Sequence, residues 1–74
     1  MPRNLYNIKG NEALRVFEKN GGVVKSGKGD HINIKMPNGM IITIPGNKIL
    51  KIGLLKAAIR KAGLTDQQFL EKLD

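Results

Sequence analysis

The clearest pattern in the chain is an alternation of apolar and polar residues over residues 30–36 and again over 40–45. A period of two is typical of a β-strand that is buried on one side. One side of these segments carries only bulky apolar residues: Ile32, Ile34, Met36, Met40, Ile42 and Ile44. The other side of the first segment is polar: His31, Asn33 and Lys35. Because Pro37-Asn38-Gly39 is a strong turn signal, we expect a β-hairpin whose return strand ends at Pro45.

Two other segments carry apolar residues at helical spacing. Residues 10–20 place three of them on one face: Ala13, Leu14 and Phe17. Residues 52–62 carry a stripe of four: Ile52, Leu55, Ile59 and Ala62. Gly21 and Gly63 follow these segments directly. Since glycine readily adopts the left-handed conformation that ends a helix, both segments are predicted to be helices that stop there.

The start of a third, short helix is marked by a capping box. Thr65 and Gln68 have the T-x-x-Q spacing in which each side chain satisfies a backbone N–H of the other residue. Its apolar face would consist of four residues, with the first two forming a hydrophobic staple: Leu64, Phe69, Leu70 and Leu73. For the first helix we expect Asn7 or Asn11 as the cap.

These elements predict an α+β fold with the order α-β-β-β-α and a short C-terminal helix. The first strand is expected at residues 22–26, before a turn at Gly27-Lys28-Gly29. Three consecutive strands joined by tight turns form a three-stranded antiparallel sheet. Helices would cover its apolar face and leave His31 on the open face. Residues 1–74 are expected to be a single domain.

Composition and charge narrow the possible functions. The 74 residues contain no cysteine and carry a net charge of +7. Residues 25–64 contain eight basic residues and one acidic residue, Asp30. This excess of positive charge indicates a polyanionic partner such as nucleic acid. The chain has neither the apolar core of a signal peptide nor a run of about 18–20 apolar residues, so we expect a cytoplasmic protein without membrane contact.

His31 is the residue whose type and position suggest chemistry. Histidine is the side chain whose ordinary pKa lies near neutrality, and this is the chain's single copy. It follows a glycine-rich turn in which the backbone at Gly29 can approach a ligand closely. Lysines lie nearby in sequence: Lys25, Lys28 and Lys35. RNA cleavage suits so small a site, because the ribose supplies its own nucleophile and the protein need only move protons and stabilise phosphate charge.

The order of elements, together with a G-x-H segment at the start of the second strand, resembles the HicA toxins. The resemblance spans residues 8–73 and rests on five segments: 13–21, Lys28-Gly29-Asp30-His31, Pro37-Asn38-Gly39, 53–64 and 66–70. It implies a fold like that of the double-stranded-RNA-binding domain and an mRNA interferase of a type II toxin–antitoxin system. It further implies metal-independent cleavage with His31 as the catalytic residue, no cofactor, and neutralisation by a HicB-type antitoxin that covers the site.

Three positions depart from the family pattern. Asp30 stands where the family commonly has serine, and it forms with His31 either a coupled pair or two independent side chains. Asn47 stands where many members carry a second histidine, so any assistance from that residue is missing here. Gly22 stands where an aromatic residue is usual, and we expect a slightly looser core around it.

Two other functions fit the same residues. A non-catalytic RNA-binding module of this fold would use six positions against the RNA backbone: Lys25, Lys28, Gly29, Lys35, Lys48 and Lys51. Its affinity would depend strongly on salt, and no cleavage product would form. A protein that binds an acidic protein partner through the same basic face is the third possibility, and it overlaps with the first because a toxin needs an antitoxin.

Overall fold

A computed structural model describes residues 4–73 of the chain. The ends of the predicted domain, residues 1–3 and 74, lie outside the described residues. The elements follow the predicted order: α1 (Gly10–Lys19), β1 (Val23–Lys25), β2 (His31–Lys35), β3 (Ile41–Pro45), α2 (Ile52–Lys61) and α3 (Asp66–Glu71). The predicted α+β fold is therefore confirmed.

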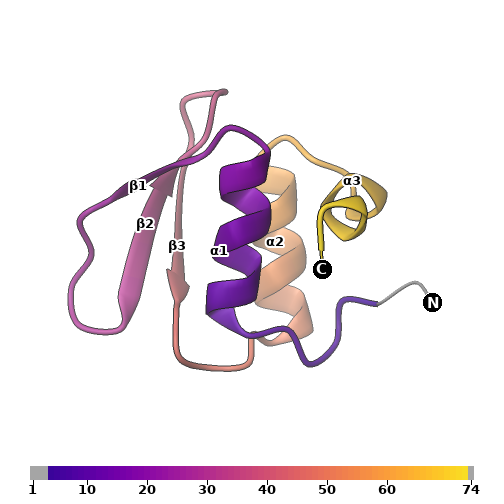
Figure 1. Ribbon diagram of the computed structural model, residues 1–74, viewed down its shortest axis with the longest axis horizontal. Helices are drawn as coiled ribbons and strands as arrows, with labels where there is room; N and C mark the ends of the chain where they lie inside the picture. Colours follow the sequence, from indigo (N-terminus) through magenta and orange to yellow (C-terminus); the bar gives the residue numbers. More distant parts are fainter. Residues whose placement is uncertain (1–3, 74) are drawn as a thin grey trace.

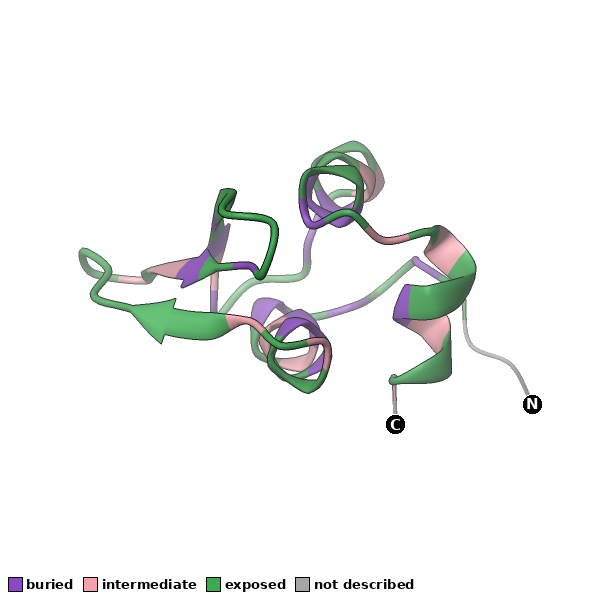
Figure 2. Cartoon of the chain, turned by 90° about the horizontal axis from the view of Figure 1, so that it is seen from above, coloured by how far each residue is buried: buried purple, intermediate pink, exposed green. Residues whose placement is uncertain are grey.

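The three strands form one antiparallel sheet in the order β1-β2-β3. Helices α1 and α2 lie side by side over one face of this sheet (Figure 1). Helix α3 lies on the far side of these two helices from the sheet, and the opposite face of the sheet is left open (Figures 1 and 2). The first residue of β2 and the last residue of β3 are partners in the register, so both lie at the same end of the sheet.

The core lies between the sheet and the helices, where the buried residues of Figure 2 face one another. The alternation in β2 and β3 correctly predicts the helix-facing row, because Ile34, Ile42 and Ile44 are buried. The stripe of α2 is also confirmed, with Leu55 and Ile59 fully buried. Among the described residues no polar or charged residue is classed as buried. Packing of apolar side chains thus holds the sheet against α1 and α2.

Met40 is an exception to the predicted apolar row, since it is 43% exposed. It belongs to the β2–β3 turn, where the N–H of Met36 donates to its carbonyl oxygen and the Asn38 side chain accepts from its N–H. This turn projects past the ends of α1 and α2 (Figure 1), so no helix covers Met40. Gly39 in the turn has a φ of +87°, which explains the glycine.

The start of α1 also differs from the prediction. Neither Asn7 nor Asn11 caps the helix; the N-cap is Lys9, whose N–H donates to the Glu12 side chain at 3.2 Å. The next two helical N–H groups are satisfied by the loop that follows β3: Gly10 N–H donates to Lys48 O at 2.9 Å, and Asn11 N–H to Gly46 O at 3.0 Å. Hydrogen bonds to a loop that is distant in sequence therefore satisfy N–H groups at the start of α1, where we expected a side-chain cap.

The C-terminal helix begins as the capping box predicts. Gln68 N–H donates to Thr65 Oγ1 at 3.1 Å, and Thr65 N–H donates to Gln68 Oε1 at 2.9 Å. Phe69 is buried, and its ring lies 5.5 Å from that of Phe17 at an angle of 57°. This tilted aromatic pair attaches α3 to α1.

The expectation of a loose core at Gly22 is wrong. A β-carbon there would lie 2.8 Å from a methyl carbon of Ile34, from the sulfur of Met36 and from the carbonyl oxygen of Phe17. Neighbouring atoms already fill the space that a side chain would need. Close packing around the glycine replaces the aromatic residue that the family usually has there.

Candidate functional site

The turn that leads into β2 fixes the backbone of His31. The N–H of His31 donates to the carbonyl oxygen of Lys28 at 3.0 Å, which closes the turn. Gly29 takes a φ of +60° inside it, a conformation that glycine adopts without strain. Gly27 runs so close to His31 that a β-carbon would overlap the His31 carbonyl oxygen. The turn residues Gly27 and Gly29 thus determine where β2 begins.

The side chain of His31 lies on the open face of the sheet, as predicted. His31 is exposed and opposite Pro45 in the register, and it shares its side of β2 with Asn33 and Lys35. Among the described residues, no hydrogen bond or ion pair occupies its imidazole. The ring is therefore available to take up or release a proton from a bound molecule.

Asn33 organises the middle of the open face, a role that the alternation alone does not reveal. Its Oδ1 accepts from Thr43 Oγ1 on β3 at 2.5 Å, and its Nδ2 donates to Ser26 O beyond β1 at 2.8 Å. The Asn33 side chain therefore links β2 to β3 on one side and to the residue after β1 on the other. These two hydrogen bonds lie two residues from His31 along β2.

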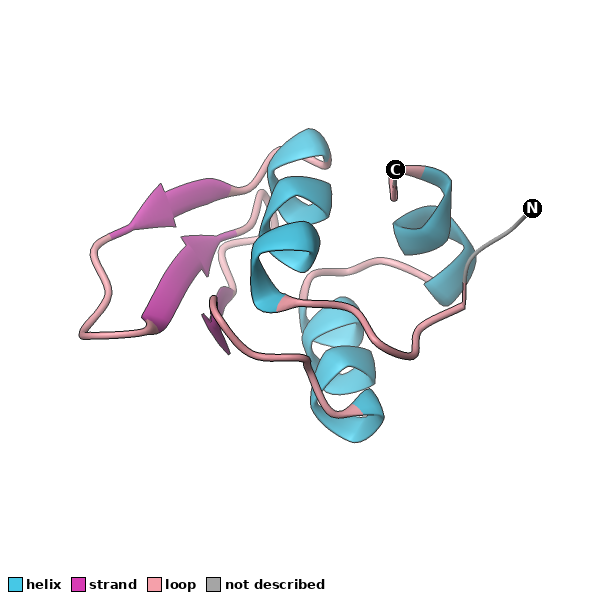
Figure 3. Ribbon diagram, turned by 60° about the horizontal axis from the view of Figure 1, so that its bottom comes forward, coloured by secondary structure: helices cyan, strands magenta, loops and turns pink. Residues whose placement is uncertain are grey.

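The structure places the predicted lysines in three parts of the fold. Lys25 pairs with Asn33 in the register and so lies on the open face, as does Lys35. Lys35 is four strand residues from His31, roughly 13 Å between Cα atoms, so the two would meet different phosphates of an extended strand. Lys28 lies in the turn itself. The remaining two, Lys48 and Lys51, lie between β3 and α2, in a segment that leaves the sheet at the end where Pro45 pairs with His31. Figure 3 shows this loop running from the sheet to α2.

All five of these lysines are exposed, and within residues 4–73 none of them forms an ion pair. Gly29, the sixth predicted contact, has no atom within 4 Å of where a β-carbon would lie, so its backbone faces open space. The five lysines, on the open face and around the end of the sheet that carries His31, thus form a basic surface that an anion can reach. Attraction of a polyanion to it follows from Coulomb's law and weakens with salt.

Asp30 forms two hydrogen bonds with the loop that follows β3. Its backbone oxygen accepts from Gly46 N–H at 2.9 Å, and its Oδ1 accepts from Asn47 N–H at 2.9 Å. Asp30 precedes β2, and within residues 4–73 no hydrogen bond or ion pair joins its carboxylate to the imidazole of His31. Of the two relations left open between these residues, the structure favours independent side chains.

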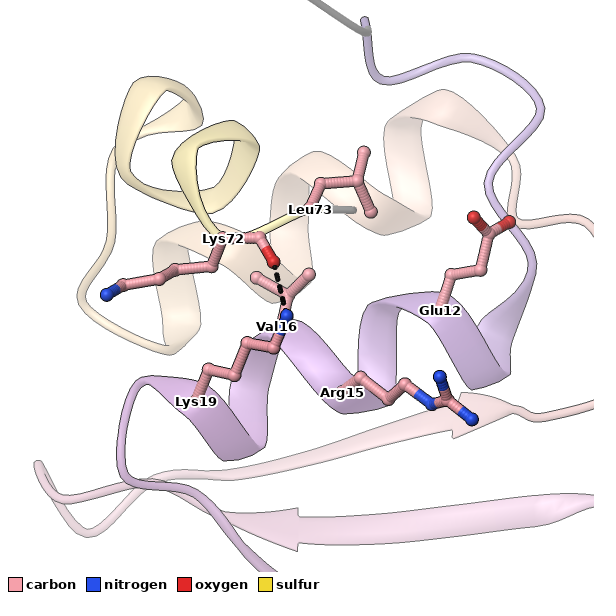
Figure 4. Close-up of a pocket in the computed structure, with 6 residues that line it drawn as sticks. All are labelled: Glu12, Arg15, Val16, Lys19, Lys72 and Leu73. Carbon is pink, nitrogen blue, oxygen red and sulfur yellow. Dashed lines mark hydrogen bonds between the residues drawn. The ribbon is translucent and has the colours of Figure 1, made fainter.

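The hollow between α1 and the segment after α3 is not a competing site (Figure 4). It is lined by six residues: Glu12, Arg15, Val16, Lys19, Lys72 and Leu73. Lys19 Nζ spans it and donates to the carbonyl oxygen of Lys72 at 3.1 Å. Helix α1 lies between this hollow and the sheet in Figure 4, and His31 is not among the lining residues. The bond from Lys19 joins α1 to the residue that follows α3 and is structural.

No three histidine, cysteine, aspartate or glutamate side chains gather into a possible metal site within the described part of the chain. Across the same residues, no helix has the length and apolar character needed to cross a membrane.

Comparison with known proteins identifies a family. A family model described as the HicA toxin of bacterial toxin–antitoxin systems matches residues 10–64. The matched range begins with α1 and ends just after α2, so it includes the whole sheet, His31 and the five lysines. No curated protein matches the sequence.

Proposed function

The chain belongs to the HicA toxin family of bacterial toxin–antitoxin systems, and we propose that it is an endoribonuclease that cleaves mRNA without a metal ion. His31 acts as the general acid and base in this proposal. The observation that supports it most strongly is the position of the His31 imidazole. It is exposed, no hydrogen bond or ion pair from residues 4–73 occupies it, and it follows the turn that carries Lys28.

Attack by the ribose 2′-hydroxyl on the adjacent phosphate is the reaction that requires the fewest protein groups. The O2′–P bond forms and the P–O5′ bond breaks. His31 accepts the proton of the 2′-hydroxyl, and a proton passes from the imidazolium to the leaving 5′-oxygen. The products are a 2′,3′-cyclic phosphate and a 5′-hydroxyl. Proton transfer of this kind accelerates a reaction by roughly 10²- to 10⁴-fold.

The lysines supply the electrostatic part of the proposal. Negative charge builds up on the phosphate oxygens as O2′ attacks, and cations held nearby stabilise it. Lys28, in the turn that carries His31, is the cation best placed for the reacting phosphate. Lys35, roughly 13 Å along β2, would hold a phosphate further along the RNA. This assigns Lys28 to catalysis and Lys35 to binding.

Neutralisation by a HicB-type antitoxin completes the proposal. Membership of the family implies an antitoxin partner. A protein that covers the open face would exclude RNA from His31. Because that face is basic, an acidic partner surface would associate with it rapidly through electrostatic steering.

The chemical route is tested with a matched pair of RNA substrates. An RNA that the protein cleaves at one site is compared with the same RNA carrying a single 2′-O-methyl group at that site. We expect cleavage of the first RNA only, with a cyclic phosphate and a 5′-hydroxyl at the new ends. Cleavage of the methylated RNA would exclude attack by the 2′-oxygen. Binding of both RNAs with cleavage of neither would favour the non-catalytic RNA-binding module.

A further inference from the structure

The negative charge of Asp30 is unexpected beside a surface proposed to bind RNA. Asp30 is the one acid among residues 25–64, and it directly precedes the residue to which we assign proton transfer to RNA. A carboxylate at that place repels phosphate, so its charge opposes the proposed function. Its hydrogen bonds show a different use, because Asp30 accepts twice from the loop after β3: from Gly46 N–H to its backbone oxygen and from Asn47 N–H to its Oδ1.

Resting on the function proposed above, we infer that Asp30 is a positioning residue. It holds the loop of residues 46–48, here called the β3–α2 clamp loop, against the turn that carries His31. The register already places Pro45 opposite His31. The bond from Asn47 to Asp30 extends this pairing by two residues, past the end of the strand. The exposed side chains of Asn47 and Lys48 are thereby kept beside the catalytic position.

The other side of the clamp loop is held by the start of α1. Asn11 N–H donates to Gly46 O at 3.0 Å, and Gly10 N–H donates to Lys48 O at 2.9 Å. The loop is thus fixed between the first helix on one side and Asp30 on the other. If the Asp30 carboxylate is removed, α1 still holds the loop, but the link from Asn47 to the His31 turn is lost.

This arrangement separates two properties of Asp30, its acceptor atom and its charge. Asp30→Asn keeps an oxygen that can accept from Asn47 N–H and removes the charge. Asp30→Ala removes both. Glu71→Ala, which removes an exposed carboxylate from α3, serves as the control for a change of net charge alone.

The experiment compares kcat and KM for cleavage of one RNA by the wild type and these three variants at low salt. We expect Asp30→Ala to lower kcat by about tenfold or more, since small displacements of positioned groups slow a reaction steeply. Asp30→Asn should keep kcat within about threefold of the wild type and lower KM, because a repulsive charge is gone. Glu71→Ala should leave kcat unchanged.

Amide hydrogen exchange gives a readout that does not depend on activity. The N–H of Asn47 should lose protection in Asp30→Ala and keep it in Asp30→Asn, while the N–H groups of β2 stay protected in both. A kcat for Asp30→Ala equal to that of the wild type would overturn the inference. So would an equal loss of kcat in both Asp30 variants, since charge and not the acceptor would then matter. A wild type that cleaves no RNA would instead contradict the proposed function.

Discussion

Gly27 lies directly against the carbonyl group of His31, so close that a β-carbon at position 27 would overlap the His31 oxygen. The residue proposed for catalysis is therefore held at its backbone by a glycine four positions earlier in the chain. Gly27 directly precedes the turn that the bond from His31 N–H to Lys28 O closes. The position of the imidazole thus depends on a residue that has no side chain.

Gly27→Ala is expected to displace the start of β2 and to lower cleavage by about tenfold or more, because the added methyl group has no space. The measurement is kcat at saturating RNA. Gly53→Ala is the matched control, since a β-carbon at Gly53 in α2 meets no atom within 4 Å. Wild-type kcat in Gly27→Ala would show that the turn tolerates the displacement and that this contact does not position His31.

Removal of a lysine on the open face is expected to change the salt dependence of RNA binding. Each phosphate contact that is lost should reduce the slope of log affinity against log salt by roughly 0.7–0.9. We predict this reduction for Lys28→Ala and for Lys35→Ala. Lys72→Ala, beyond the end of α3, should leave the slope unchanged. Equal slopes for all three variants and the wild type would place the RNA on another surface.

The same two lysines should differ in their effect on catalysis. If Lys28 stabilises the reacting phosphate and Lys35 holds a more distant one, Lys28→Ala lowers kcat whereas Lys35→Ala mainly raises KM. Cleavage measured over a range of RNA concentrations separates the two constants. The reverse pattern, with kcat lost in Lys35→Ala, would contradict the assignment made from their separation along β2.

Gly22→Ala is expected to destabilise the protein. Its β-carbon would lie 2.8 Å from atoms of Ile34, Met36 and Phe17, and overpacking of this kind costs about 1–3 kcal/mol. Urea unfolding followed by circular dichroism gives the free energy of unfolding. Gly53→Ala again serves as the control, and in an unobstructed helix it should stabilise the fold by up to about 1 kcal/mol. A stability equal to that of the wild type for Gly22→Ala would mean that the core around Gly22 yields easily.

The capping box of α3 should contribute to the stability of the protein but not to its RNA binding. Thr65→Ala removes the oxygen that accepts from Gln68 N–H and is expected to cost about 1 kcal/mol. Thr65→Ser keeps a hydroxyl and should recover most of that loss. RNA affinity should be the same in all three proteins, because α3 lies behind α1 and α2 and away from the open face. Weaker RNA binding by Thr65→Ala would show that α3 contributes to the binding surface.

Local sequence patterns predicted those parts of the fold that local chemistry determines. The alternation around Ile34 and Ile42 predicted the hairpin and the face that each strand buries. The Thr65–Gln68 spacing predicted the start of α3. The position of His31 on the open face followed from the same period of two. In each case the residues that decide the structure are close together in the chain.

The features that sequence reasoning missed depend on segments that are far apart in the chain. Leu5, Ile8 and Leu50 are buried although they lie outside any helix or strand, and Leu50 N–H donates to Ile8 O at 2.8 Å. The start of α1 is satisfied by Gly46 and Lys48, not by an asparagine cap. Contacts of this kind leave no periodic signal, because each depends on how two loops meet after folding.

The bond between Asp30 and Asn47 illustrates the same limit at the candidate site. Both positions stood out as departures from the family pattern, but their sequence separation of 17 residues gave no reason to connect them. Only the register of β2 and β3 brings the two together. The sequence indicated the residues that we propose for the chemistry, and the tertiary structure revealed the contacts around them.

The central claim is that His31 cleaves RNA without a metal ion, and one assay tests it most directly. Purified wild-type protein and His31→Ala, each free of any antitoxin, are incubated with RNA in excess chelator, and RNA affinity is measured in parallel. We predict cleavage by the wild type alone, with only a modest loss of RNA affinity in His31→Ala. Cleavage by His31→Ala at the wild-type rate, or wild-type cleavage that the chelator abolishes, would contradict the account.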